Sequence, residues 1–393
     1  MVVVAIVVAA VVYFALANNN TSTTQTVTNT VNNTNTTTVS SATTQTQVQS
    51  TTVTLSQSTT SYFVETLQAG GSTFVNPVMQ VWAVGFQQFT GGNVALNYQS
   101  VGSGAGITGV QTGTFIFGGS DAPHANQTAT QGTLLNIPET LGAVAIFYNI
   151  PGVTQSLNLT GPILAKIYLE NITMWNDPAI LALNHGVNAT LLNRAIVPVH
   201  RSDGSGTTYA LTNYFTKVST DWNASGKGFG TLVNWPTTGE LAGKGSSQVA
   251  TYVQQNFGGI GYADSYYAFS NKLLMASIQN QAGAFVPPSL AGVTAAASAF
   301  ATQLQANPTF TITNAPGATS YPISTFTYIL VWQKQSNYNQ AFDTASFIWW
   351  VVNQGQGYGP TLFYPTLPAA MVTIDEGLIA QITYNGAPVI TAG

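Results

Sequence analysis

The segment 196–217 constrains the fold most, because it predicts a strand, a glycine-rich turn and a helix in immediate succession. Residues 196–200 have the apolar pattern of a short strand, and residues 207–217 have helical spacing. The turn between them carries Arg201, one of only two arginines in the chain. The same alternation recurs along the sequence, which predicts an α/β fold whose strands deliver their loops to one edge of a sheet.

The other predicted elements follow the same alternation through the globular body, which we expect to begin near residue 61. A glycine-rich turn at 102–106 precedes a helix, and the helix over 163–175 would place Lys166 and Glu170 four residues apart on one face. The expected helices cover residues 77–86, 107–111, 163–175, 248–255, 291–305 and 342–353, and the expected strands cover 94–101, 115–118, 141–148, 258–262 and 328–332.

Two segments before the body have compositions of their own. Residues 2–17 are uninterrupted apolar residues, slightly fewer than the about 20 that span a bilayer. This run predicts a retained membrane anchor or a signal segment. In residues 18–60, 36 of 43 positions are Asn, Ser, Thr or Gln, so we expect a disordered, glycosylated stalk. Its N-linked acceptor patterns stand at Asn19, Asn20, Asn32 and Asn35.

Charge is scarce along the whole chain. Only 5% of the residues are charged, and the formal net charge is −4. No basic run is present, which argues against nucleic-acid binding. Cysteine is absent and the three histidines are scattered, which argues against thiolate chemistry and a zinc site. A surface built from uncharged polar residues suits an acidic exterior, where carboxylates are mostly neutral anyway.

Four loops place Ser or Thr beside Gly or at a predicted helix start: Thr73–Phe74, 102–104, Ser120–Asp121 and 205–207. Backbone N–H groups at a helix start bind anions, and the fork of Arg201 fits a tetrahedral oxyanion. Asp203 would orient that arginine. Asp121 would accept a hydrogen bond from a protonated oxyanion and repel one without a proton. Each loop alone is also compatible with an ordinary turn and helix cap.

Several other motifs fail on spacing. Residues 243–247, GKGSS, lack the first glycine and the Ser or Thr after Lys that a nucleotide P-loop requires. Neither 203–206 nor 101–104 fits the nucleophile elbow. His200 is close enough to Ser205 to suggest a Ser/His pair, but we expect it to pack beside the site. Trp349 and Trp350 are interpreted as core residues rather than a sugar platform.

Five blocks of sequence carry a resemblance to a known family. They are residues 70–81, 97–110 (NYQSVGSGAGITGV), 117–123 (FGGSDAP), 199–208 (VHRSDGSGTT) and 243–262. Their order and spacing resemble the phosphate-binding protein of the phosphate ABC transporter. The resemblance implies a two-lobed, type II periplasmic-binding-protein-like fold with a hinge. Lobe one would comprise residues 61–145 and 321–393, and lobe two residues 146–320.

The resemblance also implies a site and partners. The protein would be a monomer that binds inorganic phosphate without catalysis, metal or cofactor and delivers it to an ABC permease. The apolar segment and the stalk, which the resemblance does not cover, would tether it at the cell surface. A phosphate-ester enzyme and a surface-layer or filament component stay open as alternatives. The implied phosphate ligands are Thr73, Phe74, Ser103, Asp121, Arg201, Ser205, Gly206 and Thr207, with Asp203 behind Arg201.

Overall fold

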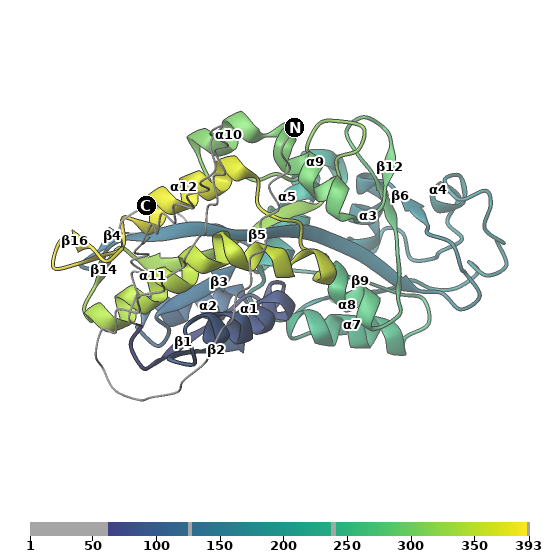
Figure 1. The fold of residues 1–393 in the computed structure, drawn as a ribbon. Helices are drawn as coiled ribbons and strands as arrows, with labels where there is room; N and C mark the ends of the chain where they lie inside the picture. The colour runs from purple at the N-terminus through teal and green to yellow at the C-terminus, as the bar shows by residue number, and fades with distance from the viewer. Residues whose placement is uncertain (1–61, 125–127, 237–240, 391–393) are drawn as a thin grey trace, which may run out of the picture. The chain divides into compact units, whose positions relative to one another are not determined.

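A ten-stranded mixed sheet runs through the part of the chain that the structure describes (Figure 1). The structure is a computed structural model that describes residues 62–124, 128–236 and 241–390. The predicted anchor and stalk lie outside the described residues. The strand order is β2-β1-β3-β13-β5-β9-β7-β8, and β4 and β10 pair with β5 beside this path. The mixture of parallel strands and covering helices confirms the α/β prediction.

The strands of this sheet are β1 (Glu65–Gly71), β2 (Val94–Ser100), β3 (Phe117–Ser120), β4 (Thr128–Ala129), β5 (Gly132–Asn149), β7 (Val197–Arg201), β8 (Leu241–Gly243), β9 (Gly259–Asp264), β10 (Leu274–Met275) and β13 (Ser324–Trp332). Two small sheets contain β6 (Asn158–Leu159), β11 (Ser277–Gln279) and β12 (Phe285–Val286), and β14 (Lys334–Gln335), β15 (Thr383–Tyr384) and β16 (Ala387–Pro388).

The α-helices are α1 (Asn76–Phe89), α2 (Ser103–Gln111), α3 (Gly161–Tyr168), α4 (Pro178–Leu181), α5 (Gly206–Val218), α6 (Thr220–Ala224), α7 (Gly245–Gln255), α8 (Ser265–Ser270), α9 (Leu290–Ala299), α10 (Ala301–Ala306), α11 (Tyr338–Val352) and α12 (Ala369–Ile379). Two 3₁₀ helices, η1 (Gln354–Tyr358) and η2 (Pro360–Leu362), follow α11.

Strand β5 joins the two halves of the sheet. Its residues 134–143 pair antiparallel with β13, and residues 144–149 pair with β9. On one side β1 pairs in parallel with β2 and β3, and on the other β7 pairs in parallel with β8 and β9. The two parallel groups give the predicted two-lobed fold. Because parallel strands end at the same edge, the loops after β1, β3 and β7 are the ones that build the site.

Aromatic side chains fill the core on both sides of β5. Trp350 is 3% exposed and its ring lies 5.7 Å from that of Phe86, which confirms its prediction as a core residue. Trp349 is half-buried and packs against the same cluster. Beyond β5, Trp222 and Trp235 pack with their ring centroids 5.9 Å apart. This burial holds the strand ends in place.

Several predicted elements have different bounds in the structure. Helix α3 ends at Tyr168 rather than 175, because Glu170 adopts a left-handed φ of 58°. Lys166 and Glu170 therefore do not share a helix face, and Lys166 pairs with Asp221 at 3.5 Å. The predicted helix 291–305 is two helices, α9 and α10, which meet at Phe300. Strand β5 is 18 residues long and begins well before residue 141.

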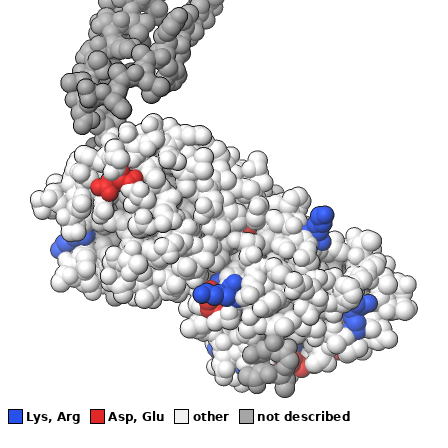
Figure 2. All heavy atoms as spheres, turned by 90° about the horizontal axis from the view of Figure 1, so that it is seen from below, with Lys and Arg blue, Asp and Glu red and all other residues white. Residues whose placement is uncertain are grey.

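Charged side chains are sparse on the face drawn in Figure 2, where they stand as isolated spots among neutral residues. Several of the acids are inside instead: Asp121, Glu139 and Asp264 are each at most 2% exposed. Within the described residues, no helix is long and apolar enough to cross a membrane.

Candidate functional site

The predicted site residues converge where β1, β3 and β7 end and where α2, α5 and α7 begin. Two walls face each other there. We call the loops after β1, β2 and β3 wall A, and the loops leading into α5 and α7 wall B. Gly104 N–H of wall A donates to Gly204 O of wall B at 2.9 Å, and the Thr73 and Ser246 hydroxyls lie 2.9 Å apart. The walls are in direct contact.

Ser103 carries the first contact from wall A. Gly102 adopts a φ of 94°, which favours glycine, and α2 begins at Ser103 rather than at 107 as predicted. The Ser103 hydroxyl accepts from the Gly206 N–H at 3.0 Å. Ser103 therefore satisfies a backbone donor at the start of a helix in the opposite wall.

Thr73 and Phe74 occupy the loop after β1. Thr73 Oγ1 accepts from the Ser246 N–H at 3.1 Å, so it touches the start of α7. The Phe74 N–H, predicted to face the ligand, donates to Ser72 Oγ at 3.0 Å. Its carbonyl accepts from the Tyr364 hydroxyl at 2.6 Å.

Asp121 is the acid of wall A and is 1% exposed. Its Oδ1 accepts from the Ser72 hydroxyl and, at 3.4 Å, from Thr327, while Oδ2 accepts from the Thr207 hydroxyl at 3.0 Å. Burial raises the pKa of Asp121 to about 6, although these hydroxyls and the charge of Arg201 favour the ionised form. Asp121 is thus an ionised acceptor at neutral pH and carries a proton in acid.

Arg201 ends β7 and supplies the positive charge of wall B. Its Nε and Nη2 donate to the two carboxylate oxygens of Asp203 at 2.7 and 2.6 Å, and the guanidinium side chain is 2% exposed. Burial alone would raise the pKa of Asp203, but the hydrogen bonds and charge of Arg201 and the Gly245 N–H outweigh it and lower that pKa. The two hydrogen bonds to Asp203 hold the Arg201 guanidinium in place.

The start of α5 completes wall B. Ser205 caps its own helix, because its hydroxyl accepts from the Thr208 N–H at 3.1 Å. Gly206 has no room for a side chain: a Cβ there would lie 2.6 Å from Asp121 N and 2.7 Å from Ala122 N. Ser205 and Thr207 are fully buried. The helix start therefore abuts Asp121 directly.

The sequence predictions missed four residues that build this site. Ser72 and Thr327 donate to Asp121, and the Tyr262 hydroxyl accepts from the Arg201 N–H at 3.2 Å. Ser246 lies in the GKGSS run at 243–247, which lacks the spacing of a P-loop. The same run marks the start of α7, and that helix start was the signal that could have identified Ser246. A cavity of about 680 Å³ opens beside the walls and is lined by Thr73, Asp203 and Lys244. Lys244 therefore lines the same cavity as Thr73 and Asp203 of the site.

His200 packs beside the site, as expected. Its ring is stacked on Trp235 with centroids 5.2 Å apart, and its Nδ1 lies 2.9 Å from Arg201 O. Ser205 bonds to its own helix instead of to this ring. Within the described residues no group of three metal-ligating side chains comes together.

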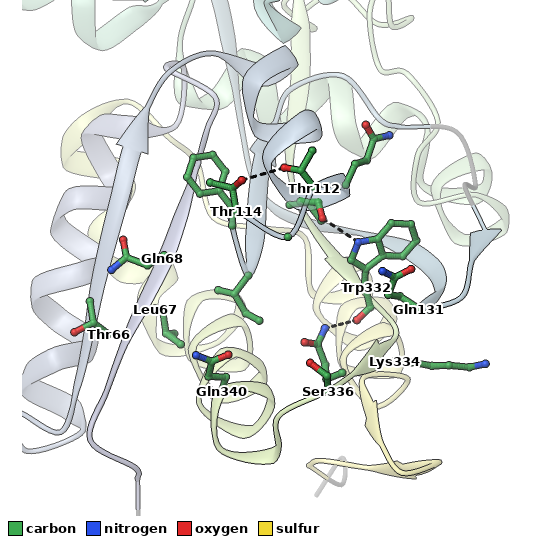
Figure 3. Close-up of a pocket in the computed structure, with 16 residues that line it drawn as sticks. Thr66, Leu67, Gln68, Thr112, Thr114, Gln131, Trp332, Lys334, Ser336 and Gln340 are labelled. Atoms are coloured by element: carbon green, nitrogen blue, oxygen red, sulfur yellow. Dashed lines mark hydrogen bonds between the residues drawn. The ribbon is translucent and has the colours of Figure 1, made fainter.

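A second cavity, of about 500 Å³, lies at the other end of β1 and β3 (Figure 3). Amide and hydroxyl side chains such as Gln68, Thr112 and Gln340 line it, and Figure 3 shows Thr112 and Thr114 bonded to each other. The Trp332 Nε1–H at its edge donates to Val110 O at 3.1 Å. None of the predicted site residues lines this cavity.

The chemistry of the two walls suits a tetrahedral oxyanion that retains a proton. Wall B offers a guanidinium and two helix starts, and wall A offers hydroxyls and one carboxylate that can accept that proton. Fold and site together define a two-lobed binding protein whose site lies between strand ends.

Comparison with known proteins agrees with this class. The model of the PBP superfamily domain matches residues 20–354. The phosphate-binding protein PstS of Xylella fastidiosa is 38% identical over 307 residues, which cover 78% of this chain and 82% of that protein. PstS of Methanocaldococcus jannaschii is 34% identical over 310 residues, covering 74% and 79%. The chain therefore belongs to the PBP superfamily and, within it, to the family of these PstS proteins.

A solved structure supports the fold. A high affinity periplasmic phosphate-binding protein bound with phosphate matches with a TM-score of 0.63 and 19% identity, covering 84% of this chain and 100% of that one. At this identity the likeness concerns the fold alone. By their names, these relatives are phosphate-binding proteins.

Proposed function

We propose that this protein captures inorganic phosphate between walls A and B and delivers it to an ABC-type permease for phosphate uptake. The observation that carries the proposal is that Asp121 of wall A lies within the electrostatic reach of Arg201, which Asp203 holds in wall B. A guanidinium fork held by a carboxylate binds two oxyanion oxygens, and a buried ionised acid selects an anion with a proton. The predicted ligands are Thr73, Phe74, Ser103, Asp121, Arg201, Ser205, Gly206 and Thr207.

The lobes open and close about β5 in this proposal. We place lobe one at residues 61–145 and 321–393 and lobe two at 146–320. The partner of β5 changes between Ala143 and Val144, and the Tyr321 hydroxyl donates to Val144 O at 2.8 Å, which supports crossings near these boundaries. A tether at the outer face of the membrane through the N-terminal segment, a glycosylated stalk and a monomeric state complete the proposal.

Equilibrium dialysis with labelled phosphate tests the function, and Arg201→Ala is the decisive variant. Truncating one partner of a buried charge pair costs about 2–5 kcal/mol or more, so binding should weaken by about 30-fold to 4,000-fold. Arg194→Ala, the other arginine, is the matched control and should bind as the wild type does, because Arg194 Nε bonds to Leu191 O away from the cleft. Equal binding by both variants would contradict the proposed site.

Two assays separate the alternatives: hydrolysis of a phosphomonoester and the same dialysis. A phosphate-ester enzyme would release phosphate from a generic phosphomonoester, whereas the proposed binding protein would not. A surface-layer or filament component with this fold would retain no phosphate in dialysis.

A further inference from the structure

One buried acid next to the site has no part in the contacts described so far. Glu139 lies on β5, is fully buried, and neither of its carboxyl oxygens has a hydrogen-bond partner. A buried polar group without a partner costs about 1–3 kcal/mol, so its presence needs an explanation. The backbone of β5 is irregular at Glu139.

Glu139 is the extra residue of a β-bulge. Thr327 pairs with Thr140 and Tyr328 pairs with Pro138, so Glu139 is left without a partner in β13. Bulges re-aim a side chain and occur often beside functional sites. Pro138 fits this position, since a bulge tolerates the missing N–H of proline. The carbonyl of Glu139 accepts from Gln356 Nε2 at 2.9 Å, which holds the bulge to the segment after α11.

Glu139 lies within electrostatic reach of Asp121, because Thr140 next to it pairs with Thr327, whose hydroxyl donates to Asp121. Burial, and then the charge of Asp121, raise the pKa of Glu139 well above its ordinary value. Tyr98 of β2 also faces Glu139, and its hydroxyl donates to Ser72 O at 3.0 Å. Burial raises the pKa of Tyr98 well above its ordinary value, so it remains a neutral phenol.

The groups that face Asp121 complete the electrostatic surroundings. Arg201 lies on the wall B side, and Asp264 of β9 and Tyr364 also interact with Asp121. Asp264 accepts from the Tyr364 hydroxyl at 3.1 Å, and burial raises the pKa of both groups well above their ordinary values. Arg201 is thus the cation near Asp121, and Glu139 is a second buried acid near it, in which burial favours the protonated form.

We propose that Glu139 sets an upper pH limit on phosphate binding: while protonated it leaves Asp121 as the single negative charge of wall A, and its deprotonation weakens phosphate binding. This inference rests on the proposed function. Glu139 is not one of the proposed phosphate ligands. It acts through Asp121, because a second buried carboxylate adds repulsion toward any anion between the walls. The upper pH limit of phosphate binding therefore depends on one residue of β5, Glu139.

Linkage fixes the sign of the effect. The folded protein holds the Glu139 proton above the pH at which an unfolded glutamate loses it, so folding stability falls as pH rises. By reciprocity, an anion that binds near Glu139 strengthens its hold on the proton. Phosphate binding should therefore take up more protons in the wild type than in a variant whose residue 139 cannot ionise.

The test is titration calorimetry of phosphate binding by the full chain from about pH 5 to about pH 9, in buffers of different ionisation enthalpy. Glu139→Gln keeps the shape and removes the charge. We expect the ratio of the wild-type Kd to the Glu139→Gln Kd to rise by about tenfold or more over this range, because one pK unit of interaction is tenfold in affinity. The variant should also take up fewer protons.

A matched control excludes a general effect of buried acids. Asp375 of α12 is fully buried, its two oxygens have no partner, and burial raises its pKa, but it interacts with Glu376 rather than with the site. The ratio of the wild-type Kd to the Asp375→Asn Kd should not change with pH. If Glu139→Gln does not fold, Glu139→Met replaces it in the same series.

Each outcome is decisive. A Kd ratio that does not change with pH, or the same rise in Asp375→Asn, overturns the role of Glu139 while leaving phosphate binding intact. Absence of phosphate binding by the wild type at every pH would instead overturn the proposed function.

Discussion

Walls A and B are built from the same local unit and use it in opposite ways. In each, a strand runs through a Gly-Ser-Gly turn into a helix. Ser205 of wall B caps its own helix through the Thr208 N–H, whereas α2 has no side-chain cap and Ser103 turns across the cleft to the Gly206 N–H. One serine thus stabilises its own element, and the other joins two elements.

The walls also differ in charge. Wall A carries a buried acid surrounded by hydroxyl donors, and wall B carries a guanidinium that its own carboxylate holds in place. The comparison teaches that a shared turn motif sets where the walls meet, while single charged side chains decide what they bind.

The largest expected effect concerns the acid of wall A. In the wild type near pH 7, ionised Asp121 should favour phosphate over sulfate by orders of magnitude, since unpaired like charges cost about 2–5 kcal/mol. Asp121→Asn can donate to either anion and should lose most of this preference. Competition dialysis with the two anions measures it.

The pH dependence of this preference follows from the raised pKa of Asp121. Below about pH 6 the carboxyl gains a proton and becomes a donor, so the preference of the wild type should fall toward that of Asp121→Asn. A preference for phosphate that is the same in acid and at neutral pH would show that Asp121 does not select the anion.

The next effect concerns the contact between the walls. Gly206→Ala would drive a Cβ into the backbone of Asp121, and overpacking of this kind costs about 1–3 kcal/mol, or about 5-fold to 150-fold in phosphate affinity. Gly377→Ala is the matched control, because a Cβ in α12 meets nothing within 4 Å. If both variants bind phosphate as tightly as the wild type, the walls do not need to touch.

The smallest effect separates the two serines. Ser205→Ala removes a helix cap and should lower the free energy of unfolding by about 0.5–2 kcal/mol. Ser103→Ala should weaken phosphate binding by about fivefold through a lost hydrogen bond of about 1 kcal/mol, with a smaller change in the free energy of unfolding. Urea denaturation and calorimetry on both variants measure the contrast; equal changes in stability would remove the distinction between the serines.

The sequence predicted the elements around the site well because their signals are local. Glycine and serine at 102–104 and 204–206 mark turns before helices, and apolar runs mark the strands that precede them. The end of α3 was missed because no Gly or Pro stands at residues 169–171 to indicate the left-handed Glu170. A tertiary contact, Lys166 with Asp221, replaces the expected helical pair.

The residues missed at the site depend on contacts distant in sequence. Thr327 reaches Asp121 across 206 positions, and Ser246 reaches Thr73 across 173. Glu139 is a bulge residue only because β13 pairs on both sides of it, and no local pattern gives that register. Pro138 before Glu139 was the one available hint of irregular pairing.

The sparse surface charge has a consequence for encounters with other molecules. Long-range attraction between proteins depends on charge and is screened over about 10 Å at 0.1 M salt. A face with so few charged side chains offers little for that field to act on (Figure 2). A membrane partner that docks on such a face recognises its shape and its hydrogen-bonding groups. The association rate should therefore change little between low and high salt concentration.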